Sequence, residues 1–419
     1  MIKPKFVWFF MGLPLAGLAR EEIPITVPFH KFSQTLLASA NFDEKSYLAF
    51  PVTLEVGPDE MLIAFKRGDA HARDPGAIYE IHAYQPSAGR LLERRAAVGE
   101  PAHPTEYYES AEFVRYPNGE ISCFFDVQEK LGVSPSDPQQ TGSHADAKAA
   151  AYSTGSTTVR LGLRVIRSRN GGKTFSPPRR VGRMDETEYG YVFDSVSRQG
   201  RTYMLAMRFA NLPGGTGLHE AWPHAGSVDV LVSEDNGHSW RMLRNLTHEF
   251  GGIPINESAL LPYQDGWLIT CRGYDDRHWL VRTNAEFRLL ARRNLTADFT
   301  CINKFVSRPR LYERDGAYYL VGRNWTQPGE TYYDTPWRLC WFRFDPDSLA
   351  IKSCVVLDNA EGHHVIDGYY ATAHWLERDG ITFFNILTHK RADFAPTHRY
   401  PGYHDSDLIR MEFLWDEVK

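Results

Sequence analysis

Residues 233–240 read SEDNGHSW, and residues 168–175 read SRNGGKTF. Each stretch follows a run of alternating apolar and polar residues, which is typical of a half-buried β-strand. Ser233 and Asp235 can hydrogen-bond the local backbone, and the glycine that follows can adopt the positive φ of a tight turn. Both stretches are therefore predicted to be hairpin turns at corresponding places of a repeated unit, with Trp240 packed between neighbouring units.

A longer pattern repeats along the chain: a strand, a tight polar turn, and a second strand that ends in charged or aromatic residues. Copies start near residues 50, 110, 194, 258, 309 and 371, and most are followed by a second hairpin. Four-stranded units that repeat radially bury each sheet against its neighbours. The chain is therefore predicted to be all-β, a six-bladed β-propeller with four-stranded antiparallel blades.

The same pattern predicts how the chain is divided. Residues 47–419 are expected to form the propeller, and residues 20–46 to contribute a strand that closes the last blade by pairing with SDLIRMEFLW (406–415). Lys3 and Lys5 precede an apolar run and small residues, which predicts a signal peptide over residues 1–19 and a secreted or periplasmic protein. The alternative for this run is a buried first strand. No later segment has the length of a membrane span.

Composition narrows the function. The net charge of -5 gives no basic footprint for nucleic acid, whereas 13% aromatic residues suit β-structure and clefts that stack on sugar rings. The five cysteines are scattered without metal-ligand spacing, so Cys123 and Cys271, in expected strands, are predicted to be buried thiols. We expect no cofactor and no metal.

The turn sequence Ser-x-Asp-x-Gly-x-x-Trp resembles the Asp-box (BNR) repeat of the sialidase-like propeller superfamily. SEDNGHSW matches it fully, and SRNGGKTF matches it with Asn170 and Phe175 as replacements. The resemblance covers essentially residues 47–415 and implies an exo-glycosidase whose site lies at one end of the propeller axis. The turns themselves indicate architecture only, because they are expected on the outer rim.

The resemblance also implies catalytic residues. Glu257 in INESALL occupies the place of the glutamate that activates a nucleophilic tyrosine, and Tyr369 in IDGYYATAHWL matches that tyrosine. The acid/base aspartate is expected after LIAFKRG, where Asp69 and Asp74 are both candidates. A neutral tyrosine suits a sugar with a carboxylate at the reacting carbon, since that carboxylate would repel a carboxylate nucleophile.

Arginines are implied as ligands of the substrate carboxylate. Arg272 matches the second arginine of the family's triad, and Arg308 or Arg310 the third, with Arg308 favoured. The chain departs from the family at the first arginine, because YLAFPVTL (47–54) places Ala49 there. Lys66 or Arg67 would have to replace it, so the sugar is expected to be a different one, acidic or neutral.

Other residues are candidates by position. Trp222, in a Gly/Pro-rich loop over 208–226, and a second aromatic loop over 323–337 could form walls of the site. Residues 129–156 are a polar insertion that could act as a lid. His278 is a candidate substrate ligand. It also belongs to a set of loop histidines that could face the axis, the others being His71, His219, His224, His363 and His364.

Three functions follow, in order of preference. The first is a secreted exo-glycosidase that hydrolyses a terminal, acidic sugar with a Tyr/Glu pair and an aspartate acid/base. The second is a propeller-type polysaccharide lyase that acts on uronates with histidine and tyrosine, and the third is a glycan-binding propeller without catalysis. In each case the expected partner is a glycan, without nucleic acid or a membrane span, and the protein is expected to be a monomer.

Overall fold

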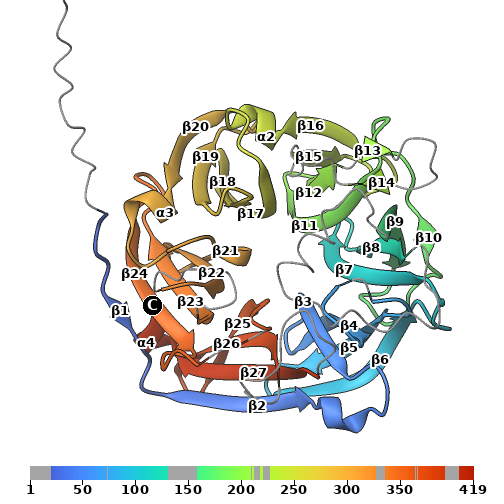
Figure 1. Ribbon diagram of the computed structural model, residues 1–419, viewed down its shortest axis with the longest axis horizontal. Coiled ribbons are helices and arrows are strands. Elements are labelled where there is room, and N and C mark those ends of the chain that lie inside the picture. Colours follow the sequence, from blue (N-terminus) through green and yellow to red (C-terminus); the bar gives the residue numbers. More distant parts are fainter. Residues whose placement is uncertain are drawn as a thin grey trace, which may run out of the picture.

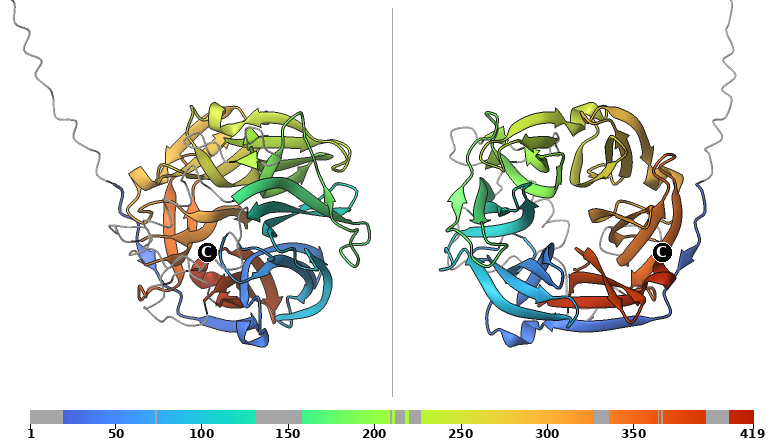
Figure 2. Two further views of the ribbon diagram at one scale, coloured as in Figure 1. Left: turned by 45° about the vertical axis from the view of Figure 1, so that its right-hand side comes forward. Right: turned by 180° about the vertical axis from the view of Figure 1, so that it is seen from behind.

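The computed structural model of the protein describes residues 20–72, 74–130, 158–208, 210–211, 218–219, 227–326, 336–363, 365, 367–391 and 405–419. Within these ranges the strands form six sheets, which stand around a common axis (Figure 1). The view from behind shows the same ring (Figure 2). The predicted all-β, six-bladed β-propeller is confirmed.

The first three sheets follow one another along the chain. The first has the order β3-β4-β5-β6, formed by Tyr47–Gly57, Glu60–Gly68, Ile78–Gln85 and Arg90–Val98. In the second, β7 (Glu106–Arg115), β8 (Ile121–Lys130) and β9 (Thr158–Ser168) pair in order, β10 (Arg179–Arg180) and β14 (Leu218–His219) both pair with β9, and β13 (Ala210–Asn211) pairs with β14. The third has the order β11-β12-β15-β16, formed by Tyr189–Arg198, Arg201–Arg208, Ser227–Ser233 and Arg241–Asn245.

The remaining sheets complete the ring. The fourth, β17-β18-β19-β20, consists of Ile255–Tyr263, Gly266–Gly273, His278–Thr283 and Leu289–Asn294. The fifth, β21-β22-β23-β24, consists of Ser307–Arg314, Ala317–Asn324, Arg338–Phe344 and Ile351–Asp358, and β1 (Ile25–Thr26) adds a parallel strand to it. The sixth, β25-β26-β27-β2, consists of Thr372–Arg378, Ile381–Lys390, Asp407–Leu414 and Lys31–Leu37. Short helices are η1 (Ser39–Asn41), α2 (Leu246–Glu249), α3 (Leu295–Asp298) and α4 (Trp415–Val418).

The sixth sheet takes its outer strand from the N-terminal part of the chain. β2 pairs antiparallel with β27, with Lys31 opposite Phe413. Figure 1 shows β2 running along the outside of β27. This pairing joins residues that are far apart in sequence and closes the ring with main-chain hydrogen bonds.

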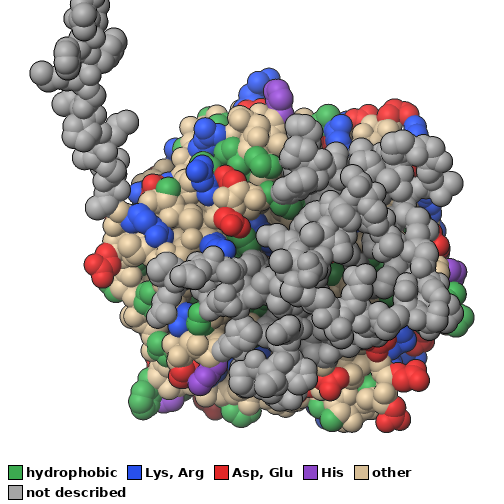
Figure 3. Space-filling view, viewed as in Figure 1, with side chains coloured by type: hydrophobic (Ala, Val, Ile, Leu, Met, Phe, Trp, Pro, Cys, Tyr) green, Lys and Arg blue, Asp and Glu red, His purple; other side chains and the backbone are tan. Residues whose placement is uncertain are grey.

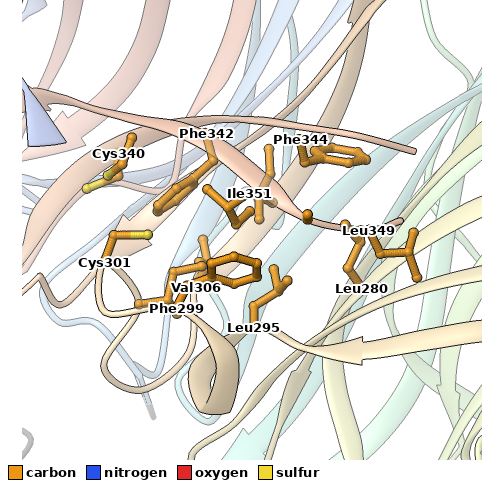
Figure 4. Packing of buried hydrophobic residues seen from close by; sticks show 14 of the residues in the cluster. Leu280, Leu295, Phe299, Cys301, Val306, Cys340, Phe342, Phe344, Leu349 and Ile351 are labelled. Carbon is orange, nitrogen blue, oxygen red and sulfur yellow. The ribbon is translucent and has the colours of Figure 1, made fainter. Parts of the chain in front are cut away.

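The hydrophobic core lies between the sheets. Each pair of neighbouring sheets shares a separate cluster of buried apolar side chains, so six of the seven clusters within the described residues form a ring between the sheets. Figure 4 shows the cluster between the fourth and fifth sheets, where Leu280 and Leu295 face Phe342 and Ile351. All five cysteines are buried thiols, as predicted for Cys123 and Cys271.

The two turns that the sequence repeats have the same hydrogen bonds. Ser233 Oγ accepts the N–H of Gly237 at 2.7 Å, and Ser168 Oγ accepts the N–H of Gly172 at 2.8 Å. Both glycines have positive φ, 75° and 82°. A Cβ at Gly237 would lie 2.2 Å from the hydroxyl of Tyr116 in the preceding sheet, so this turn also packs one blade closely on the next.

Candidate active site

The inner strands are irregular where they start. Pairing shifts in register between residues 49 and 52 of β3, 108 and 110 of β7, 190 and 194 of β11, 255 and 258 of β17, and 307 and 310 of β21. A bulge of this kind leaves residues unpaired and re-aims their side chains. Glu257 and Arg308 lie in two of these bulges, and Arg308 has a φ of 44°, in the left-handed region that residues other than glycine rarely adopt.

Glu257 is the meeting point of three segments. Its Oε2 accepts hydrogen bonds from Arg272 Nη1 and from the backbone N–H of Arg308, both at 2.8 Å. Its Oε1 accepts a hydrogen bond from the hydroxyl of Tyr370 at 3.2 Å. The structure therefore brings together Glu257, Arg272 and Arg308, as the resemblance implied, and adds Tyr370.

The charge of Glu257 is fixed by these contacts. Burial alone would raise the pKa of Glu257, but Arg272 and the N–H of Arg308 lower it to about 2. The carboxylate is therefore ionised at neutral pH and accepts a hydrogen bond from the neighbouring hydroxyl group.

Tyr369 lies elsewhere. Its hydroxyl donates to Asp358 Oδ2 at 2.6 Å, and its side chain is fully buried in the core between the fifth and sixth sheets. Tyr369 has a φ of 67°. Because of this left-handed residue, the segment before β25 is not a regular strand start, and Tyr370 points to Glu257 in place of Tyr369.

Arg308 and Arg310 share one carboxylate. Glu112, on β7, accepts from Arg308 Nη2 at 2.9 Å and from Arg310 Nη2 at 2.5 Å. Arg310 also contacts Asp194 at 3.2 Å, so its guanidinium is held on two sides and lies further along β21 than Arg308. Burial raises the pKa of Glu112, although Arg310 and Arg308 oppose this. Of the two arginines, Arg308 is the one next to Glu257.

The position of the expected first arginine is apolar. Ala49 is fully buried, and the ring of Phe50 lies 4.9 Å from the ring of Tyr370, centroid to centroid. Lys66 is fully buried and bonded to Glu109 at 3.0 Å, and Glu109 and Asp74 raise the pKa of Lys66 although burial opposes them.

Arg67 points away from this position. Its guanidinium donates to Glu80 at 2.8 Å and lies 4.3 Å from the ring centre of Phe42. Lys66 is held by buried carboxylates and Arg67 by Glu80, so the structure places neither at the cluster around Glu257 as a substitute for the arginine.

The two candidate aspartates hold the loop after β4. Asp74 is 1% exposed, and its Oδ2 accepts the backbone N–H groups of Asp69 and Ala70 at 3.0 and 3.1 Å. Asp69 accepts the N–H of Lys45 at 3.0 Å. The structure thus shows Asp74 as a buried loop anchor and Asp69 as a backbone acceptor, and among the described residues neither bonds Glu257.

His278 is part of the blade core. It is fully buried, its Nδ1 accepts the N–H of Val306 at 3.2 Å, and its Nε2 contacts Thr270 Oγ1 at 2.7 Å. Burial and the nearby Arg272 lower the pKa of His278 to about 3. Trp222, His224, His364 and residues 131–157 and 327–335 lie outside the described residues, so the expectations for these segments stay predictions.

A second polar cluster lies beside Tyr370. It includes His71, one of the loop histidines named from the sequence, and Asp367, which the sequence did not single out. Asp367 is fully buried, and its Oδ2 accepts from the Tyr47 hydroxyl at 2.5 Å and contacts His71 Nδ1 at 2.8 Å. The His71 ring lies 6.1 Å from the Tyr370 ring, and Arg323 lies 5.2 Å from it. In the sequence, Asp367 and Tyr370 stand close together in IDGYY, and this is the only local pattern that could have indicated the cluster.

Three further features of the described residues concern metal ligands, membrane spans and surface charge. No three His, Cys, Asp or Glu residues in the described ranges meet in a way that could hold a metal ion. In the same ranges no helix is long and apolar enough to cross a membrane. On the described part of the face in Figure 3, acidic and basic side chains are interspersed.

Comparison with known proteins gives similarity at the level of structure. No family model matches the sequence, and no curated protein matches it. A protein of unknown function from Dyadobacter fermentans is 13% identical with a TM-score of 0.60, covering 91% of this chain and 98% of that one. The sialidase of Trypanosoma rangeli, in complex with 2,3-difluorosialic acid as a covalent intermediate, is 10% identical with a TM-score of 0.56.

The chain covers 60% of the length of the Trypanosoma rangeli sialidase, and 94% of this chain is aligned with it. An α-L-arabinofuranosidase from Fusarium graminearum, in complex with an iminosugar inhibitor, is 9% identical with a TM-score of 0.52, covering 93% of this chain and 99% of that one. These similarities confirm the sialidase-like fold that the turn sequences indicated.

Proposed function

We propose that this protein is a glycoside hydrolase in which Tyr370 is the nucleophile and Glu257 its general base. The observation that carries the proposal is the 3.2 Å contact between the Tyr370 hydroxyl and Glu257 Oε1. Nucleophilic tyrosine is the known exception to the use of two carboxylates in glycosidases, and it requires a neighbouring base. The covalent intermediate of the Trypanosoma rangeli sialidase fits the same type of chemistry.

The geometry around Glu257 suits this role. Oε2 is held by Arg272 and by the N–H of Arg308, so the carboxylate cannot rotate freely and Oε1 stays directed to Tyr370. When the Tyr370 oxygen attacks the anomeric carbon, its proton passes to Oε1. The sugar is then bound covalently through Tyr370 until water releases it with retained configuration.

We further propose an acidic sugar as the substrate. Arg272 and Arg308 flank Glu257 from two strands, and guanidinium groups bind carboxylates by paired hydrogen bonds. A tyrosine nucleophile also avoids the charge repulsion that an acidic sugar would impose on a carboxylate. As the sequence predicts, such a protein would act outside the cell or in the periplasm, where terminal sugars of glycans are accessible.

A neutral sugar is the second candidate, and one observation favours it. Ala49 and Phe50 place apolar groups next to Tyr370, where the resemblance implied an arginine, and buried Lys66 is bonded to Glu109. An apolar ring of this kind can stack on the face of an uncharged pyranose or furanose.

The test is product analysis with purified protein and a panel of 4-methylumbelliferyl glycosides: the α-N-acetylneuraminide, the β-D-glucuronide and the α-L-arabinofuranoside. Tyr370→Phe is compared with Tyr369→Phe, which removes the neighbouring hydroxyl group that bonds Asp358. The proposal expects release of a saturated sugar that Tyr370→Phe reduces by about 10²- to 10⁴-fold and Tyr369→Phe leaves within about threefold.

Other outcomes would reject it. An unsaturated uronate formed from a uronate oligosaccharide, which unlike the glucuronide of the panel carries a leaving sugar at O4, would assign elimination. Binding without product would assign a glycan-binding protein. Equal loss in both tyrosine variants would remove Tyr370 from the role of nucleophile.

A further inference from the structure

We infer that His71 is the general acid and base of this reaction and that Asp367 is its positioning residue. The inference rests on the proposed function, because it names the group that protonates the leaving oxygen. His71 lies on the loop after β4, where the sequence predicts an aspartate in this role. The observation is a pair made of a fully buried carboxyl group and a partly exposed imidazole ring beside the proposed nucleophile.

The tautomer of His71 follows from its contacts. Tyr47 has one hydroxyl proton, and it is donated to Asp367 Oδ2 at 2.5 Å. His71 Nδ1 lies 2.8 Å from the same oxygen and 3.1 Å from the Tyr47 oxygen, so Nδ1 must carry a hydrogen to be accommodated there. Proton exchange with a substrate therefore belongs to Nε2.

Asp367 is itself held in place. Its Oδ1 accepts the N–H of Gly368 at 2.8 Å, Arg323 Nη1 lies 3.9 Å from the same oxygen, and His389 Nε2 lies 3.5 Å from it. The His71 side chain is 16% exposed whereas that of Asp367 is fully buried. A buried carboxylate that orients an accessible imidazole is the arrangement by which histidine acts as acid and base.

The His71 ring is a direct neighbour of the Tyr370 ring. The His71 ring stands at 72° to the Tyr370 ring with centroids 6.1 Å apart, and the Tyr370 hydroxyl is directed to Glu257. Phe50 lies between the elements and contacts both rings, at 4.9 Å from each centroid. Asp74, by contrast, is 1% exposed and bonded to two backbone N–H groups, so it cannot reach a leaving group.

The proposed hydrolysis has two steps. In the first, the bond from Tyr370 Oη to the anomeric carbon forms, the bond to the leaving oxygen breaks, the phenol proton goes to Glu257, and Nε2 of the imidazolium gives its proton to the leaving oxygen. In the second, neutral Nε2 takes a proton from water as the water oxygen attacks, and Glu257 returns its proton to Tyr370. The sum is glycoside plus water giving sugar plus alcohol.

The experiment compares two leaving groups on the sugar that the panel identifies, the 4-methylumbelliferyl and the methyl glycoside. An acid is needed far more by the methyl glycoside, because its leaving alkoxide is strongly basic. We expect His71→Ala to lower kcat/KM for the methyl glycoside by about 10²- to 10⁴-fold and for the aryl glycoside by less than about tenfold. Asp367→Asn should show the same leaving-group dependence to a smaller degree.

His82→Ala is the matched control. His82 is 15% exposed and contacts the buried carboxylate of Glu80 at 2.9 Å, as His71 contacts Asp367. His82 and Glu80 both lie on β5, where Glu80 also bonds Arg67 of β4. His82→Ala should leave kcat/KM unchanged for both the methyl and the 4-methylumbelliferyl glycoside. Equal losses of kcat/KM for both substrates in His71→Ala would overturn the assignment of His71. The proposed function would still stand if Tyr370→Phe abolishes most of the activity.

A second readout needs no substrate. In protein with ¹⁵N-labelled histidine, the NMR signals of His71 should show hydrogen on Nδ1 in the neutral ring, and Asp367→Asn should change that tautomer. Neutral His71 with its hydrogen on Nε2 would overturn the inference, whatever the panel shows. A panel without any hydrolysis would overturn the proposed function and, with it, the catalytic role of His71.

Discussion

Tyr369 and Tyr370 are consecutive residues whose hydroxyl groups bond different carboxylates, Asp358 and Glu257, at 2.6 and 3.2 Å. Asp358 is also bonded by Lys390 and by Lys31, and it belongs to a buried network between the fifth sheet and the sixth. One tyrosine therefore stabilises the fold, and the other belongs to the candidate site.

This division predicts effects of different size on stability. Tyr369→Phe should lower the free energy of unfolding by about 1.5–3 kcal/mol, because a buried hydrogen bond to a charged group is lost. Tyr370→Phe should change it by less than about 1 kcal/mol, because Glu257 keeps Arg272 and the N–H of Arg308 as partners. Urea unfolding of both variants checks this, and a larger loss for Tyr370→Phe would contradict it.

Glu257→Gln should lower kcat/KM by about 10²- to 10⁴-fold, because the amide cannot accept the phenol proton. Glu80→Gln is the control, since burial would raise the pKa of Glu80 but His82 and Arg67 lower it to about 2, as for Glu257. Glu80 lies on β5 away from Tyr370, so its variant should keep full kcat/KM. Loss of turnover in both variants would point to a general effect of removing buried charge.

Arg308→Gln separates substrate binding from catalysis. The side chain of Arg308 bonds Glu112, whereas its backbone N–H, which the substitution keeps, bonds Glu257. With an acidic substrate, KM should rise by about tenfold or more with little change in kcat, because one charged hydrogen bond to the carboxylate is lost. An unchanged KM would favour the neutral sugar that Ala49 and Phe50 suggest.

Acid should destabilise the protein through His278. Its pKa is about 3 in the folded state, below the ordinary value of 6.5, so between these pH values the unfolded chain binds a proton that the folded chain does not. Stability should therefore fall as pH decreases from 6.5, by about 2 kcal/mol at pH 5 from this residue. Denaturant unfolding at pH 7 and at pH 5 gives the loss of unfolding free energy between the two pH values. This loss should be smaller for His278→Gln than for the unsubstituted protein, and unchanged for the exposed His103→Gln.

The repeated turn can be tested with alanine. Gly237→Ala places a Cβ 2.2 Å from the Tyr116 hydroxyl, whereas Gly200→Ala, in the same blade and also at positive φ, meets no atom within 4 Å. Both variants bear a left-handed alanine, which costs about 1–2 kcal/mol. Gly237→Ala should be clearly less stable in urea than Gly200→Ala. Equal stabilities would show that the contact between the blades relaxes.

The fold could be predicted from sequence because its signals are local. Alternating strands, polar turns and the Ser-x-Asp-x-Gly pattern recur within each blade, and each blade repeats the same packing problem. Glu257, Arg272 and Arg308 could also be expected at one end of the propeller, because each stands near the start or the end of a strand that the sequence reveals.

The orientation of single side chains could not be predicted in the same way. A bulge or a left-handed residue shifts the alternation of a strand by one position, as at Tyr369, and no repeat in the sequence reveals it. The carboxylates that hold Lys66 and Arg67, Glu109 and Glu80, come from other strands, β7 and β5, so the directions of these two side chains depend on contacts between strands. The pairing of His71 with Asp367 spans 296 positions and arises only when the ring is closed.

The pairing of β2 with β27 makes completion of the sixth blade depend on both ends of the described chain. Residues 31–37 have no sheet to join until residues 407–414 exist, so blades one to five can collapse during synthesis but the sixth cannot. His71 and Asp367, on blades one and six, meet across this same junction. The candidate catalytic pair would therefore form only when the ring closes, and a chain whose ring stays open would lack a working site.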